Sequence, residues 1–118
     1  MNVSKLENIE QLINGKKIDQ AQMELSKLGP EFLKNTQYLY LRSKIFYFNK
    51  LYYLALDTLL ISLEFGENEK IYSLISKIYK TLGNLELSKK VANPNLRINA
   101  ITTLKNELTG ISQKGYEI

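Results

Sequence analysis

The chain contains no cysteine and no histidine among its 118 residues. Without cysteine it cannot form a disulfide, a thiolate metal site or a thiol nucleophile. Without histidine it lacks the commonest general base and the commonest metal ligand. An enzyme would need a carboxylate pair or a buried lysine, but the cluster of Glu64, Glu67 and Glu69 falls in a turn, where solvated charge is the ordinary explanation. We therefore expect no catalytic activity, no cofactor, no bound metal and no small-molecule substrate.

Long apolar runs are also missing. The most apolar stretch, residues 51–63, is interrupted by Asp57, Thr58 and Ser62, so it is too short and too polar to span a bilayer. The first ten residues lack the apolar core of a signal peptide. These features favour a cytoplasmic protein. Only two prolines and six glycines are present, which favours helices over a β-sandwich or barrel.

Apolar residues recur every three to four positions along most of the chain, which is helical spacing. Helix punctuation agrees with this period: Asn68 and Asn84 are candidate N-caps, Gly83 ends a helix, and Asn93-Pro94 marks a restart. No stretch alternates as a strand does, so the fold class is all-α. The predicted helices span residues 5–14, 17–28, 31–49, 51–64, 69–82, 85–92 and 95–108.

The first six predicted helices form hairpins that repeat along the sequence. A small residue early in each second helix, Ala21, Ala55 or Ser88, recurs after 34 and then 33 residues. Such a residue allows two helices to cross closely, and a large neighbour fills the gap beside it. A large apolar residue precedes each small one by nine positions: Leu12, Phe46 and Tyr79.

The third unit carries the clearest motif, with a large residue, a small one and an aromatic at fixed places. Tyr72, Ile75, Ser76, Tyr79 and Ser88 stand where the tetratricopeptide repeat has Trp, Leu, Gly, Tyr and Ala. The chain therefore resembles this family over residues 4–92. The resemblance implies a right-handed solenoid of about three antiparallel helical hairpins closed by a C-terminal capping helix, in one domain. The implied parts are the domain 1–109, with units 4–29, 31–65 and 69–92 and capping helix 94–109, and a flexible tail 110–118.

The other units match this pattern less well. The second has Arg42 where the family has Leu, and the first is degenerate. These departures leave the exact repeat count open, and another kind of helical hairpin array is the alternative. We assign Leu39, Phe46 and Tyr52 to the core of the second unit.

In tetratricopeptide domains the first helix of each pair lines a concave groove. The resemblance therefore implies an aromatic and basic groove that binds a peptide or amphipathic helix, with apolar anchors and some acidic residues, as an adaptor or chaperone does. The aromatics would form an exposed apolar patch, although aromatics at helical spacing are more often core. The candidate groove residues are Tyr40, Lys44, Tyr47, Phe48, Lys70, Lys77 and Lys80.

Three alternatives stay open. The size and the C-terminal half loosely resemble small tetratricopeptide co-chaperones of type III secretion systems, which hold an amphipathic filament-subunit helix. The apolar stripe of the last helix also fits a homodimer.

Finally, the net charge is −1 over residues 1–69 and +5 over residues 70–118. This asymmetry allows nucleic-acid binding, although the scarcity of arginine weakens that reading. The basic set concerned is Lys70, Lys77, Lys80, Lys89, Lys90, Arg97 and Lys105.

Overall fold

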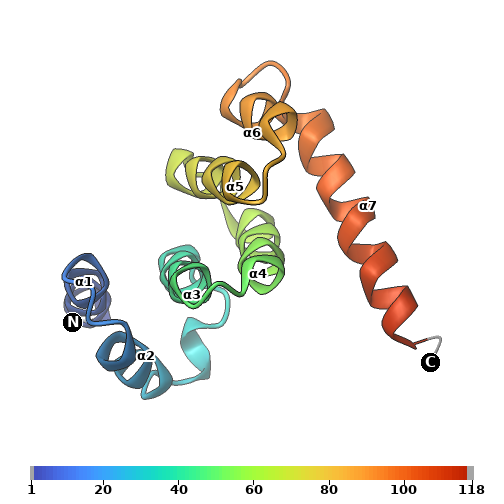
Figure 1. The fold of residues 1–118 in the computed structure, drawn as a ribbon. Helices are drawn as coiled ribbons and strands as arrows, with labels where there is room; N and C mark the ends of the chain where they lie inside the picture. The colour runs from blue at the N-terminus through green and yellow to red at the C-terminus, as the bar shows by residue number, and fades with distance from the viewer. Residues whose placement is uncertain (1, 117–118) are drawn as a thin grey trace. The chain divides into compact units, whose positions relative to one another are not determined.

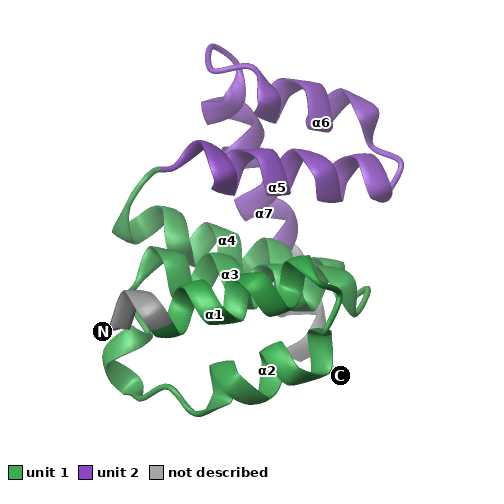
Figure 2. Cartoon of the chain, turned by 90° about the vertical axis from the view of Figure 1, so that its left-hand side faces the viewer, with its two compact units in different colours: residues 1–67 green, residues 68–118 purple. Residues whose placement is uncertain are grey.

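The computed structural model describes residues 2–116, and the side chains of residues 5–109. Within these residues the fold is all-α, as predicted, with no strand (Figure 1). The chain forms two compact units, residues 1–67 and residues 68–118 (Figure 2). The elements are α1 Asn2–Asn14, α2 Ile18–Ser26, the short 3₁₀ helix η1 Pro30–Phe32, α3 Thr36–Phe48, α4 Tyr52–Phe65, α5 Glu69–Thr81, α6 Leu85–Ala92 and α7 Arg97–Tyr116.

The first unit contains two helical hairpins, α1 with α2 and α3 with α4, and α3 also packs against α1 and α2. Its core is mainly aliphatic, with the aromatic residues Phe32 and Tyr38 buried in it. Ile9 and Ile13 of α1, Leu41 of α3, and Leu56 and Leu59 of α4 have almost no exposed surface. Burying one such side chain contributes about 1.5–3 kcal/mol, so these residues are the main stabilising contribution to the unit.

The second unit is the hairpin of α5 and α6 followed by α7, which packs against α6. Ile71, Ile75 and Ile78 form one buried stripe along α5 at positions i, i+4 and i+7. Val91 of α6 and Leu104 of α7 are fully buried as well. The boundary between the units, after residue 67, falls in the turn between the predicted units 31–65 and 69–92.

Asparagine caps set several helix starts. The side chains of Asn68 and Asn84 accept backbone N–H bonds from Lys70 (2.7 Å) and Leu87 (3.1 Å), as the sequence predicted. Asn35 acts in the same way, and its side chain accepts the N–H of Tyr38 at 2.9 Å. This cap corrects the predicted helix 31–49. Because Asn35 fixes the start of α3 at residue 36, the preceding residues form only the η1 turn.

The same kind of tight turn connects the two helices in each of the three hairpins. Lys16, Lys50 and Gly83 have positive φ angles of 64°, 63° and 85°, and they lie 34 and 33 residues apart. In each turn the next residue donates its N–H to a carbonyl five positions earlier, which is the Schellman arrangement. These bonds run from Lys17 to Leu12 (2.8 Å), from Leu51 to Phe46 (2.9 Å) and from Asn84 to Tyr79 (2.9 Å). The accepting residues are the three large apolar residues of the sequence repeat.

The small residues of the sequence pattern lie where helices meet. Ala21 and Ala55 are fully buried. In the third hairpin, Ser76 of α5 and Ser88 of α6 are linked reciprocally: each hydroxyl donates to the other residue's carbonyl, at 2.7 Å and 2.8 Å. The close crossing of α5 and α6 thus depends on two small side chains that also satisfy their own polar groups.

The last helix begins and ends later than predicted. Asn93 accepts the N–H of Asn95 through its side chain at 2.9 Å, and this turn precedes α7, which starts at Arg97 instead of residue 95. The helix continues past residue 108 to Tyr116. The flexibility of the predicted tail 110–118 stays a prediction, because residues 117–118 and the side chains of 110–116 lie outside the described part. The right-handed array, the repeat count and the single domain 1–109 also stay predictions.

Candidate partner-binding surfaces

Four of the predicted groove residues lie on α3, and we call Tyr40, Lys44, Tyr47 and Phe48 the α3 strip. The sequence predicted that its three aromatics are exposed together. The structure corrects this, because all three are half-buried, and Tyr40 and Phe48 pack against the core of the first unit. Each of the three side chains is therefore partly covered by the fold and partly accessible to solvent.

The predicted core residues of this region differ in their burial. Leu39 is buried, as predicted. Phe46 and Tyr52 are only half-buried, so their assignment to the interior holds in part. Helical periodicity identified the correct faces of the helices but not how completely their neighbours cover them.

Cations lie over the aromatic rings of the strip. The Lys44 ammonium is 5.6 Å from the centre of the Tyr40 ring, and the Lys16 ammonium is 4.3 Å from that of Phe48. The Tyr47 ring meets Phe48 edge-on at 5.5 Å and packs against Tyr52 at 5.9 Å. Cation–π attraction therefore places positive charge beside half-exposed apolar surface. Sequence reasoning missed Lys16, which reaches the strip from the α1–α2 turn.

An acid from α1 lies at one end of the strip. Glu10 accepts a hydrogen bond from the side-chain amide of Gln37, with the two atoms 2.7 Å apart. Burial, and secondarily the charge of Glu10, raise the pKa of the Tyr40 hydroxyl. This hydroxyl therefore stays protonated and can donate a hydrogen bond to a ligand.

The other predicted groove residues, Lys70, Lys77 and Lys80, are exposed on α5 in the second unit. They share one helix, and none is buried among apolar side chains. The strip and these lysines belong to different compact units, so their assembly into one groove stays a prediction.

Arg97, the one arginine in the predicted nucleic-acid set, is not a surface residue. It is 8% exposed, and its guanidinium donates to both carboxylate oxygens of Glu69, at 2.8 Å and 3.3 Å. It also donates to the carbonyls of Val91 (3.2 Å) and Ala92 (3.4 Å). The hydrogen bond from Arg97, opposed by some desolvation, holds the pKa of Glu69 below its usual range. Because Arg97 has this structural role, it is removed from the predicted basic surface.

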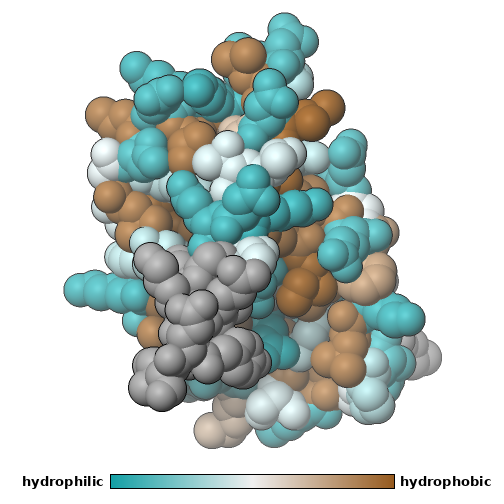
Figure 3. Space-filling model, turned by 90° about the vertical axis from the view of Figure 1, so that its right-hand side faces the viewer, coloured by the Kyte–Doolittle hydropathy of each residue, from teal (hydrophilic) through white to brown (hydrophobic). Residues whose placement is uncertain are grey.

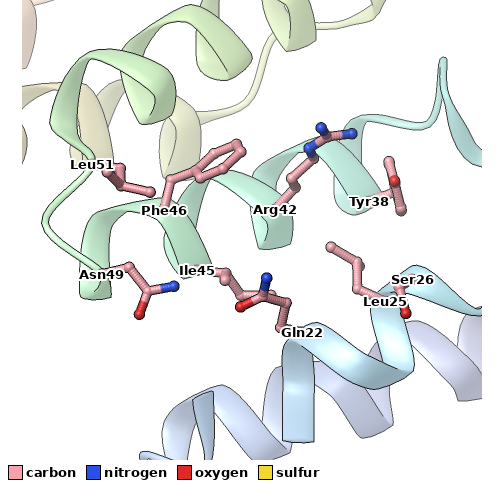
Figure 4. A pocket seen from close by; sticks show the side chains of 9 residues that line it. All are labelled: Gln22, Leu25, Ser26, Tyr38, Arg42, Ile45, Phe46, Asn49 and Leu51. Atoms are coloured by element: carbon pink, nitrogen blue, oxygen red, sulfur yellow. The ribbon is translucent and has the colours of Figure 1, made fainter. Parts of the chain in front are cut away.

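A pocket of about 300 Å³ lies between α2 and α3 of the first unit, where the sequence predicted no site (Figure 4). Arg42 and Phe46 project from the same side of α3, and Gln22 and Leu25 reach toward them from α2. The only signal in the sequence was Arg42 itself, at a position where the repeat pattern has Leu. The lining residues are Gln22, Leu25, Ser26, Tyr38, Arg42, Ile45, Phe46, Asn49 and Leu51.

A second, smaller pocket of about 200 Å³ is lined by Lys5, Asn8, Ile9, Glu24, Lys27 and Leu28. On the face drawn in Figure 3, apolar side chains are interspersed with hydrophilic ones. Within the described residues, no three acidic side chains come together as metal ligands. None of the helices in that part of the chain is long and apolar enough to cross a membrane. No family model, no curated protein and no solved structure matches this chain.

Proposed function

We propose that the chain is a non-enzymatic protein-binding module, an adaptor or chaperone of the tetratricopeptide kind, and that the α3 strip contacts its partner. The single observation that carries the proposal is the pairing of half-exposed rings with overlying cations, Lys44 with Tyr40 and Lys16 with Phe48. Such a surface offers apolar contact area and positive charge together. It therefore fits an amphipathic helix that carries both apolar anchors and acidic residues.

Two further observations support the family part of this proposal. The three left-handed turn residues, Lys16, Lys50 and Gly83, recur with the period of the sequence repeat. The paired serines Ser76 and Ser88 occupy the positions where the family pattern requires small residues. An amphipathic filament-subunit helix is one partner of the required chemistry. In the second unit, the exposed lysines of α5 would bind acidic residues of the same partner.

Site-specific photo-crosslinking tests the proposal. A photoreactive amino acid replaces Tyr47 in the strip or, as the control, the exposed Glu86 on α6. We expect the strip position, but not the control, to crosslink one protein of the producing cell. That partner is then purified and its affinity for the chain is measured directly.

Charge reversal then tests the residues. The variant Lys44→Glu with Lys77→Glu is compared with Lys89→Glu, an exposed lysine of α6 outside the proposed surface. Reversing charges that face an acidic partner should weaken binding by more than tenfold, since each such contact contributes about 1 kcal/mol or more. Equal affinities of the double variant and the wild type would refute the proposed surface.

A further inference from the structure

The pocket between α2 and α3 contains a positive charge, and no acidic side chain of the described residues lines the pocket beside it. None of its nine lining residues is Asp or Glu. Arg42 is exposed, and within the described residues its guanidinium carbon lies 5.6 Å from the centre of the Phe46 ring. A guanidinium has five N–H donors in a rigid fork that matches a carboxylate. The contact with the ring uses none of these donors.

The rest of the pocket combines apolar walls with a few polar groups. Leu25, Tyr38 and Ile45 form its buried wall, and the side-chain amides of Gln22 and Asn49 are available at its exposed rim. Pockets that bind ligands have this composition, in which apolar surface supplies affinity and a few polar groups fix orientation. Together with the charge of Arg42, it points to a carboxylate carried beside a hydrocarbon group.

The pocket is open to solvent, and this favours a carboxylate on a peptide side chain over a small free acid. Arg42, Gln22, Ser26, Asn49 and Leu51 are all exposed, so a small free acid would stay largely in water. Small-molecule sites usually bury most of their ligand. A side chain of a bound peptide, whose backbone stays outside, fits an open pocket of about 300 Å³ better.

We propose that the pocket between α2 and α3 binds an acidic side chain of a partner peptide, with Arg42 on the carboxylate and an apolar neighbour against Leu25 and Ile45. This inference rests on the proposed role in protein binding but not on the α3 strip. Arg42 would form a bidentate pair with the carboxylate, and Gln22 and Asn49 would donate to its remaining lone pairs. The Arg42 position thus departs from the repeat pattern because it serves recognition instead of packing.

The test uses the ¹⁵N-labelled full chain and two short blocked peptides, one with glutamate between two leucines and one with glutamine in its place. Because Arg42 and Arg97 are the only arginines, only two Nε–H signals are expected, and Arg97 serves as the internal control. We expect the glutamate peptide to shift the Arg42 signal and the side-chain amides of Gln22 and Asn49. The glutamine peptide should bind roughly tenfold more weakly, because its side chain carries no negative charge to pair with Arg42.

Two variants give the controls. Arg42→Gln removes the charge and should weaken the glutamate peptide roughly tenfold, whereas Lys34→Gln removes an exposed charge elsewhere in the first unit and should leave binding unchanged. Unshifted backbone amide signals of the first unit away from position 42, together with an unshifted Arg97 signal in the second unit, show that Arg42→Gln is folded.

Several results would overturn the proposal: equal binding of the two peptides, unchanged binding by Arg42→Gln, or shifts confined to the α3 strip. Equally tight binding of free 3-methylbutanoate would also overturn it, since the ligand would then be a small acid. If Arg42→Gln alone loses the peptide while charge reversal of the strip leaves partner affinity intact, the strip fails and the pocket stands. If charge reversal of the strip weakens partner binding while Arg42→Gln leaves peptide binding intact, only the pocket proposal is refuted.

Discussion

Arg97 and Arg42 both lie beside an aromatic ring, but their surroundings are opposite. The guanidinium carbon of Arg97 is 4.1 Å from the centre of the Tyr72 ring, and that of Arg42 is 5.6 Å from Phe46. Arg97 is buried and donates to Glu69 and to two backbone carbonyls. Arg42 is exposed at the rim of a pocket that contains no acid.

This difference indicates which of the two arginines can bind a ligand. The donors of Arg97 are engaged in holding the start of α7 to α5 and to the end of α6. Removing them would leave polar groups without partners, which costs more than the bonds contribute. Among the described residues, the donors of Arg42 hold no element together, so a ligand can bind them without disturbing that part of the fold. Whether a basic residue can bind a ligand therefore depends on whether its donors are already occupied, and not on its charge alone.

The largest expected effect in this comparison is that of Arg97→Ala. We expect it to lower the free energy of unfolding by about 3 kcal/mol, because bonds to the Val91 and Ala92 carbonyls and the stacking on Tyr72 are lost together. The ion pair itself contributes little, since the Glu69 side chain is 76% exposed. Urea unfolding followed by circular dichroism measures the change. A loss no larger than that of Lys105→Ala, an exposed control on α7, would contradict the structural role of Arg97.

Arg97→Lys separates charge from geometry. Lysine keeps the positive charge but lacks the planar fork, so it cannot donate to Glu69 and to both carbonyls while stacking on Tyr72. We expect an intermediate loss of about 1–2 kcal/mol in the same unfolding experiment. Full stability of this variant would show that charge alone accounts for the site.

The helices and many of their ends were predictable, because local signals determine them. Asn68 and Asn84 lie directly before apolar periods and cap as expected. The N-cap role of Asn35 was missed because the proline at position 30 is itself a helix-start signal. The turns at Lys16 and Lys50 were predicted as breaks, but lysine gives no sign of a left-handed backbone, whereas Gly83 does.

The site was less predictable, because it depends on contacts between distant segments. Periodicity predicted Tyr40 and Phe48 as exposed side chains of α3, but both pack against the core of the first unit, and their half-burial depends on that packing. The bond between Arg97 and Glu69 joins residues 28 positions apart, so local pattern cannot reveal it. Arg42 was visible only as a departure from the repeat.

Acid should weaken the Arg97 site with a defined sign. The pKa of Glu69 is lowered in the folded state, mainly by the hydrogen bond from Arg97. Its contribution is therefore fully present above the unfolded value, about 4.3, and is lost as pH falls through the lower folded value. We expect the stability difference between wild type and Glu69→Gln to be largest at neutral pH and to shrink on acidification. A difference independent of pH would show that the carboxylate charge is not involved.

The smallest expected effect is that of Arg42→Ala on stability. Because Arg42 is exposed and, among the described residues, contacts the Phe46 ring, we expect the free energy of unfolding to change by less than about 0.5 kcal/mol. The measurement is the urea unfolding used for Arg97→Ala, with both variants in parallel. A loss approaching that of Arg97→Ala would mean that the guanidinium is part of the α2–α3 packing. Its charge would then have a structural reason, and the case for an acidic ligand in the pocket would lose its main support.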